Sequence, residues 1–249
     1  MERIETGIKG LDELIQGGFP KNRMVLVSGA TGTGKTTFSM QYIIHGAKNG
    51  EPGVYITVDE KPESIREDMK QFGFDVDELE KEGKIAILDA SSAKVGYTSK
   101  EKYSIPQIGL DIDELILKAV DLIEKIGAKR VVLDSIPGLG MQIEDEHEMR
   151  NIILKMNYMF SEENVTAIMT SEVPEQSLKV DRMQFSKYEV EAYVADGVIM
   201  LHYLGVGSES NRSLFIRKMR GTKHTEDILP MEITSQGVEI KPPEKGYEY

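Results

Sequence analysis

Eight consecutive residues near the N-terminus have the glycine spacing and the charge that are needed to bind phosphate groups. They are Gly29, Ala30, Thr31, Gly32, Thr33, Gly34, Lys35 and Thr36. The glycines let the backbone turn tightly with its N–H groups pointing inward, Lys35 can reach the β and γ phosphates of a nucleotide, and Thr36 can hold Mg²⁺. We assign Thr37, the next residue, to the same site. The stretch therefore predicts a binding site for ATP and Mg²⁺.

Acidic residues follow two apolar runs that are typical of buried strands. Asp59 and Glu60 follow residues 54–58, and Asp134 lies near the end of the run 130–135. In open sheets of alternating strands and helices, binding sites form where the strands end. Asp134 could accept a hydrogen bond from a water molecule bound to Mg²⁺, as the acid after a strand does in P-loop NTPases. Because apolar strands that end in Asp are common, this assignment depends on the phosphate-binding loop.

The phosphate-binding residues need a buried strand before them and a helix after them, and the sequence predicts both. Residues 24–27 are apolar, and apolar residues at helical spacing follow Lys35. We expect further strands at 54–58, 85–88, 130–135, 165–172, 197–204 and 212–218, and a terminal hairpin of residues 231–234 and 238–240. We expect further helices at 63–72, 112–126 and 149–160. Residues 91–110 have no clear periodicity, and we assign them no role.

The composition limits the classes of protein to which the chain can belong. Its 249 residues are enough for one large core, and we expect one domain over residues 1–241 and a short polar tail at 242–249. No apolar run approaches the ~18 residues that a membrane span needs, and the N-terminus lacks the apolar segment of a signal peptide, so we expect a cytoplasmic protein. The chain has no cysteine, which excludes disulfides and thiolate metal sites. Its net charge of −12 argues against non-specific DNA binding as the main activity.

Two motifs before the phosphate-binding loop complete a pattern that is found in a known family. They are T-G-I-K-G-L-D at residues 6–12 and G-G-F-P at residues 17–20. Together with the loop they closely resemble the RecA-like ATPases of the KaiC type. The resemblance covers nearly the whole chain, as one copy of a module that the circadian-clock ATPase carries twice. It implies a RecA-type P-loop α/β fold, with a twisted, mainly parallel sheet, helices on both faces and a C-terminal β extension, and it implies hydrolysis of ATP.

A basic motif near the C-terminus strengthens the resemblance. Residues 218–224 read K-M-R-G-T-K-H. In the family, the lysine and arginine of this motif reach the γ phosphate held by a neighbouring subunit, and the histidine lies near the rim of the nucleotide. The resemblance places these roles on Lys218, Arg220 and His224, and it implies a homo-oligomeric ring, expected to be a hexamer. The alternative is an exposed basic hairpin, since clustered Lys and Arg usually form a solvated surface.

The resemblance also implies the remaining catalytic roles. One carboxylate would orient the attacking water. Many relatives carry two glutamates where this chain has Asp59 and Glu60, and the shorter Asp59 favours the longer side chain of Glu60, with Asp59 as the second candidate. Thr170 or Ser171, at the end of the strand expected over 165–172, would sense the γ phosphate. These two residues could equally cap the turn that precedes Pro174.

Three functions are compatible with the sequence. We expect a signalling or regulatory ATPase with a protein partner, and a scaffold that uses nucleotide to hold a ring together is related to it. The alternative is a DNA-dependent ATPase of the recombinase type, whose DNA-binding loop would be residues 175–191. That segment has few cations and only scattered aromatic residues, so we expect a solvated loop and do not favour nucleic acid. Autophosphorylation is not expected, because the Ser-Thr pair that the clock protein phosphorylates falls on Ala192 and Tyr193.

Overall fold

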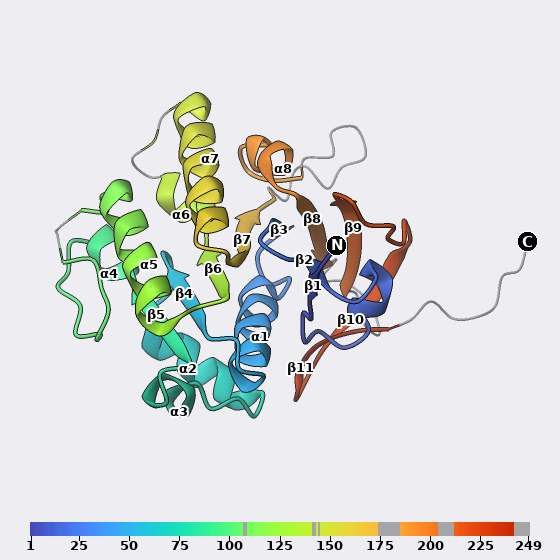
Figure 1. Ribbon diagram of the computed structural model, residues 1–249, viewed down its shortest axis with the longest axis horizontal. Coiled ribbons are helices and arrows are strands. Elements are labelled where there is room, and N and C mark those ends of the chain that lie inside the picture. The colour runs from blue at the N-terminus through green and yellow to red at the C-terminus, as the bar shows by residue number, and fades with distance from the viewer. Residues whose placement is uncertain (107–108, 141–142, 144, 174–184, 204–211, 242–249) are drawn as a thin grey trace, which may run out of the picture.

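The computed structural model describes residues 1–106, 109–140, 143, 145–173, 185–203 and 212–241. Within these ranges the chain forms a nine-stranded sheet with helices on both faces (Figure 1). The order of its strands is β11-β10-β9-β8-β3-β7-β6-β4-β5. Their bounds are β3 Met24–Gly29, β4 Gly53–Thr57, β5 Ile85–Asp89, β6 Arg130–Asp134, β7 Thr166–Glu172, β8 Gly197–Tyr203, β9 Arg212–Met219, β10 Ile228–Thr234 and β11 Gly237–Ile240. A separate two-stranded sheet pairs β1 (Arg3–Ile4) with β2 (Phe19–Pro20).

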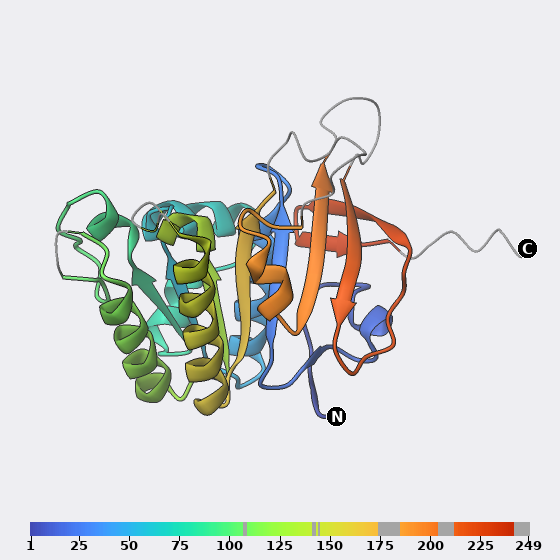
Figure 2. The same ribbon diagram turned by 90° about the horizontal axis from the view of Figure 1, so that it is seen from above.

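The sheet is parallel from β5 to β8 and antiparallel beyond β8. Strands β5, β4, β6, β7, β3 and β8 run in one direction, and β9, β10 and β11 continue the sheet with alternating directions. Figure 2 shows the arrows of β8 and β9 pointing opposite ways. The predicted fold class, including the C-terminal β extension, is confirmed. The terminal hairpin is longer than expected, because β10 begins at Ile228.

Two apolar layers hold the helices against the sheet. Helices α5 and α7 pack on one face, and α1, α2 and α3 pack on the other (Figure 2). Since side chains alternate along a strand, Val54 and Ile56 of β4 face the first layer while Tyr55 faces the second. The bounds of the helices are α1 Lys35–Lys48, α2 Pro62–Gln71, α3 Val76–Lys81, α4 Ser91–Lys94, α5 Ile112–Ile126, α6 Ile136–Leu139, α7 Glu146–Glu162 and α8 Val190–Val194, with a 3₁₀ helix at Asp12–Ile15.

Four short helices, α3, α4, α6 and α8, were not predicted. Helix α3 is defined by its cap, because the Asp75 carboxylate accepts a hydrogen bond of 3.1 Å from the backbone N–H of Glu78. Helix α4 lies within the segment 91–110, which had no expected structure. Helix α8 follows residues expected to form a solvated loop, yet Glu191 is only 1% exposed. The prediction of a solvated loop is therefore wrong for Ser186 and Glu191, which are buried, whereas Lys187 and Glu189 are exposed as expected. Residues 174–184 lie outside the described residues.

A buried arginine joins α1 to the sheet. Arg130 at the start of β6 is 1% exposed, and its guanidinium bonds Glu51 Oε2 at 2.5 and 2.9 Å and the carbonyl oxygen of Tyr42 at 2.8 Å. The guanidinium also lies 4.5 Å from the centre of the Tyr42 ring. It passes α1 at Gly46, where a Cβ atom would collide with Arg130 Nε. The glycine in this helix therefore makes room for a charged side chain that is fully paired inside the protein.

None of the helices in the described ranges is long and apolar enough to cross a membrane. The polar tail expected at 242–249 lies outside those ranges.

Candidate functional site

The phosphate-binding loop connects β3 to α1 and is shaped by close backbone packing. Gly34 has a φ angle of 98°, in the left-handed region that glycine favours, and a Cβ atom there would lie 2.8 Å from Ile233 Cδ1 of β10. The Thr33 hydroxyl donates to the carbonyl oxygen of Ala30 at 2.8 Å, which closes the loop. Thr31 and Gly32 are exposed at its tip. The loop thus has the strand before it and the helix after it that the prediction required.

Lys35 lies across its own loop. Its ammonium donates to the carbonyl oxygens of Gly29 at 2.9 Å and of Ala30 at 3.0 Å. Burial lowers the pKa of Lys35, and the carboxylates of Glu172, Asp134 and Glu60 oppose that shift. A charge that is partly desolvated and bonded only to neutral carbonyl groups gains strongly from an anion placed in the loop.

Asp134 accepts hydrogen bonds from three hydroxyl groups. The donors are Thr36 at 2.8 Å and Tyr55 at 2.6 Å, both to Oδ2, and Thr170 at 2.5 Å, to Oδ1. The fold therefore brings the two residues predicted to hold Mg²⁺, Thr36 and Asp134, into direct contact. Sequence reasoning missed Tyr55, which reads as an ordinary core residue of β4. Its pKa is raised by burial and then by Asp134, so Tyr55 remains a neutral donor.

The donor set around Thr36 fits a magnesium ion. The Thr36 hydroxyl and the Asp134 carboxylate supply two oxygen ligands. The loop can hold the phosphates of a nucleotide, whose oxygens are the other ligands that Mg²⁺ commonly takes. In the described part of the chain no cluster of three or more His, Cys, Asp or Glu side chains could hold a metal by itself. A site of this kind suits an ion that arrives with a nucleotide, because Mg²⁺ keeps several waters and phosphate oxygens.

Asp59 and Glu60 lie at the end of β4 in different surroundings. The Asp59 carboxylate is occupied: Oδ1 accepts from Lys94 Nζ at 2.5 Å and Oδ2 from Ser135 Oγ at 2.7 Å. The Glu60 carboxylate has no hydrogen-bond or ion-pair partner within the described residues. Although part of its side chain is exposed, desolvation raises the pKa of Glu60, with further contributions from Asp134, Asp68 and Asp59. Glu60 is thus the carboxylate free to contact a ligand.

The two candidate sensors of the γ phosphate have separate positions. Thr170 bonds Asp134. Ser171 is buried, and its hydroxyl donates to Glu191 Oε1 at 2.9 Å. The fold therefore places Thr170, and not Ser171, beside the predicted metal site. Glu172, which the sequence did not single out, lies opposite Gly29 in the register of β7 with β3.

The basic motif lies at the other end of the sheet from the phosphate-binding loop of its own chain. Met219 is opposite Gly197 of β8, and Gly197 is opposite Val25 at the start of β3. The loop begins at Gly29, four residues further along β3, which is about 13 Å at ~3.3 Å per residue. Lys218 and Arg220 are therefore not gathered with Lys35, Glu60 and Asp134 within one chain.

At that end of the sheet, the side chains of the motif contact their own chain. Lys218 Nζ donates to the carbonyl oxygens of Ala192, Tyr193 and Ala195 at 3.1, 3.3 and 2.5 Å. Arg220 bonds Asp196 Oδ1 at 3.3 Å. Burial lowers the pKa of Lys218, and the neighbouring Arg220 lowers it further. The Nδ1 atom of the His224 ring lies 2.8 Å from the carbonyl oxygen of Thr225.

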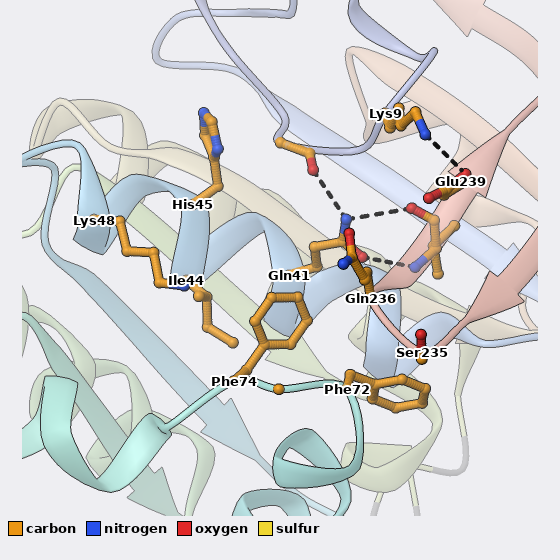
Figure 3. Close-up of a pocket in the computed structure, with 13 residues that line it drawn as sticks. Lys9, Gln41, Ile44, His45, Lys48, Phe72, Phe74, Ser235, Gln236 and Glu239 are labelled. Atoms are coloured by element: carbon orange, nitrogen blue, oxygen red, sulfur yellow. Dashed lines mark hydrogen bonds and ion pairs between the residues drawn. The ribbon is translucent and has the colours of Figure 1, made fainter.

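A pocket of about 480 Å³ lies between α1, the turn after α2 and the β10–β11 hairpin (Figure 3). Phe72 and Phe74 form one wall, and Lys48 Nζ lies 5.4 Å from the centre of the Phe74 ring. Gln41 ties the hairpin to α1, because it donates to Val238 O at 3.3 Å and accepts from Val238 N at 2.8 Å. Since Ile233 of the same hairpin contacts Gly34, the β extension forms a wall of the candidate site that the sequence did not reveal.

The chain is similar to known proteins in sequence and in fold. A family model described as "ATPase: KaiC" matches residues 4–245. The chain is 40% identical over 247 residues to a UPF0273 protein of Thermotoga maritima, which covers 99% of this chain and 98% of that protein. It is 34% identical over 239 residues to the circadian clock oscillator protein KaiC of Parathermosynechococcus lividus, covering 96% of this chain and 42% of that one. The crystal structure of a KaiC-like protein from Pyrococcus horikoshii matches with a TM-score of 0.79 and 38% identity, covering 97% of this chain and 99% of that one.

Proposed function

Because the chain belongs to the KaiC family of ATPases, we propose that it binds ATP with Mg²⁺ and hydrolyses it to ADP and phosphate. The observation that carries this proposal is the contact of Thr36 with Asp134 directly behind the phosphate-binding loop. A hydroxyl and a carboxylate joined in this way at the start of a helix are the protein ligands that P-loop enzymes offer to magnesium. Tyr55 and Thr170 orient the carboxylate from the other sides.

In the proposed reaction, the loop and Lys35 bind the phosphates. The backbone N–H groups of the loop and the first turn of α1 supply partial positive charge, and Lys35 exchanges its two carbonyl acceptors for phosphate oxygens. Magnesium, when bound, neutralises charge that develops on the β and γ phosphates. Glu60 accepts a hydrogen bond from the attacking water and orients it toward the γ phosphorus, while Lys94 and Ser135 hold Asp59 beside it.

We assign Lys218 and Arg220 to the ATP of an adjacent chain in a homo-oligomeric ring. Their separation from the loop of their own chain supports this assignment, because they lie at opposite ends of the same strands. To reach a neighbour's phosphate, Lys218 has to leave the three carbonyl oxygens that it now contacts. The charge that it would stabilise there is largest in the transition state.

The test of the proposed function is phosphate release by the purified full-length protein with ATP, with and without Mg²⁺. Mass in solution is measured in parallel, with and without ATP. We expect hydrolysis that requires Mg²⁺ and a larger mass with ATP. Lys35→Ala should abolish ATP binding in calorimetry without unfolding the protein. Unchanged ATP affinity in the folded Lys35→Ala variant would exclude this loop as the nucleotide site.

Adding single-stranded DNA to the same assay distinguishes a regulatory ATPase from the recombinase alternative. Phosphate release is measured with and without single-stranded DNA at low salt. We expect no stimulation, because the chain carries a net charge of −12. Stimulation by DNA, together with a filament in place of a closed ring, would favour the recombinase alternative.

A mixing experiment tests the assignment of Lys218 and Arg220. Lys35→Ala chains keep both cations but lack a working loop, and Lys218→Ala/Arg220→Ala chains have the reverse defect. We expect both to be inactive alone, since cations supplied in trans are worth ~10³–10⁵ in rate in other nucleotide hydrolases. Mixed assemblies should regain phosphate release in proportion to the interfaces that pair an intact loop with intact cations.

The matched control is Lys223→Ala, an exposed lysine of the same segment, which should hydrolyse ATP normally. If mass measurements show that the chains exchange and no mixing ratio restores activity, the cations do not act across the interface.

A further inference from the structure

A second charged pocket, of about 230 Å³, lies at the outer edge of the sheet, between the end of β5 and α5. Its lining includes Lys102, Tyr103 and Ser104, which follow β5, and Lys118, Asp121 and Lys125 of α5. Part of this lining comes from the segment 91–110, to which the sequence assigned no role. The residues from α5 are spaced by three or four positions, so they share one face of that helix.

Three lysines converge on this pocket without carboxylate partners. Lys102 Nζ lies 5.0 Å and Lys125 Nζ 5.1 Å from the centre of the same Tyr103 ring. Asp121 is the one acid in the lining, and none of the ion pairs formed by the described residues includes Lys102, Lys118 or Lys125. Three solvent-exposed positive charges therefore lie around one small pocket beside the Tyr103 ring.

The cluster contrasts with the rest of the molecule. The chain has 42 acidic and 30 basic residues, and most lysines with a defined contact are paired with a carboxylate, as Lys70, Lys94 and Lys155 are. A group of three unpaired lysines in an acidic protein concentrates the local potential at one place. An anion with more than one charge would be attracted to that place.

We propose that this pocket binds a phosphate-bearing anion with two or more charges, such as pyrophosphate or a short oligophosphate. Lysines bind phosphate as point charges from several directions, so an anion whose charge is spread over several phosphate oxygens can contact all three. The Ser104 side chain adds a hydroxyl group to the lining. The site is separate from the phosphate-binding loop and extends the proposed function rather than depending on it.

The backbone connects this pocket to the acids at the candidate catalytic site. Asp89 N donates to the carbonyl oxygen of Tyr103 at 3.0 Å, and Ile105 N donates to Asp89 O at 3.1 Å. The Asp89 carboxylate accepts from Ser91 and Ser92 at the start of α4. Helix α4 carries Lys94, which bonds Asp59. An anion bound beside Tyr103 by the three lysines would therefore contact a segment that is hydrogen-bonded to Asp89. From Asp89, helix α4 leads to Lys94 and so to Asp59.

The experiment is calorimetric titration with pyrophosphate, tripolyphosphate and citrate in Mg²⁺-free, low-salt buffer. The full-length Lys35→Ala protein is used, because that substitution removes competing binding at the phosphate-binding loop. We expect saturable binding of tripolyphosphate. In Lys35→Ala protein that also carries Lys102→Gln/Lys125→Gln, the dissociation constant should rise ~10-fold or more, since two charges are lost.

The matched control is Lys35→Ala protein that also carries Lys129→Gln, which removes an exposed lysine outside the lining and should leave the dissociation constant unchanged. Amide hydrogen exchange gives a second readout, and bound tripolyphosphate should slow exchange at Ile105. Equal affinities in the lysine variants and the control, or no saturable binding at all, would overturn the site. Tighter binding of citrate than of pyrophosphate would overturn its assignment to phosphate.

Discussion

Replacing Glu60 by Gln tests the proposed chemistry at its most specific point. The amide keeps the shape of the side chain but cannot accept a proton from water. Since the Glu60 carboxylate has no partner among the described residues, its replacement breaks no contact that holds the fold. The expected loss is therefore confined to general-base catalysis, about 10²–10⁴ in turnover. ATP affinity, set by the loop and Lys35, should stay within a few-fold of wild type.

The assay is phosphate release at saturating ATP and Mg²⁺, with ATP affinity measured separately by calorimetry. Asp59→Asn is the matched control. Its carboxylate already holds Lys94 and Ser135, so the substitution weakens an ion pair and should reduce turnover by less than ~10-fold. If Asp59→Asn is inactive while Glu60→Gln releases phosphate at the wild-type rate, the roles of the two acids are reversed.

The pH dependence gives an independent check. The reactive form of Glu60 is the carboxylate, and its pKa is raised, so protonation begins at a higher pH than for an ordinary glutamate. Wild-type turnover should fall as pH decreases through that raised pKa, and any residual turnover of Glu60→Gln should lack this limb.

The raised pKa of Glu60 affects the stability of the protein in the opposite direction from its turnover. Its contribution to the free energy of unfolding is fully present at low pH and is lost as the pH rises through the pKa of Glu60 in the folded state. At neutral pH, Glu60→Gln should therefore unfold at a temperature no lower than wild type, and a clearly lower unfolding temperature would show that Glu60 holds the structure.

Two further substitutions test other parts of the structure. Tyr55→Phe removes one hydroxyl donor from Asp134, so the Mg²⁺ concentration that gives half-maximal phosphate release should rise about 10–100-fold, as for other groups that orient a metal ligand. An unchanged Mg²⁺ requirement would make Tyr55 a core residue only. Gly46→Ala should lower the free energy of unfolding by about 1–3 kcal/mol in urea titration. The new methyl group collides with Arg130, and the cost of this collision exceeds the ~1 kcal/mol gain in helix propensity. Increased stability would show that Arg130 moves aside freely.

The sequence predicted the sheet and the phosphate-binding loop because both rest on local signals. Buried parallel strands are short apolar runs, and the loop is a fixed spacing of glycines before Lys35. Asp134 was singled out for the same reason, as an acid at a strand end. The short helices were missed because four to six residues are too few to show an apolar stripe, and α3 is marked in the sequence only by its Asp75 cap.

Contacts between distant parts of the chain were beyond the reach of sequence patterns. Tyr55 looks like core until β4 and β6 are set side by side, with Thr57 opposite Asp134. Glu191 lies in a polar stretch, yet it is buried because Ser171 and Ser186 both donate to it. The position of Lys218 at the far end of the sheet follows from strand register, which the motif does not encode.

The placement of the loop and the basic motif at opposite ends of the sheet limits the symmetry of any active assembly. When Lys218 and Arg220 of one chain contact the loop of a second chain, and the loop of the first chain is left for a third, the contact is heterologous and repeats head to tail. A two-fold dimer makes the same contact only if the motif and the loop of each chain lie within one self-complementary surface. Chains linked head to tail either close or continue as a filament. An open array has one complete site fewer than it has chains, because its last loop has no neighbour, whereas a closed ring completes them all.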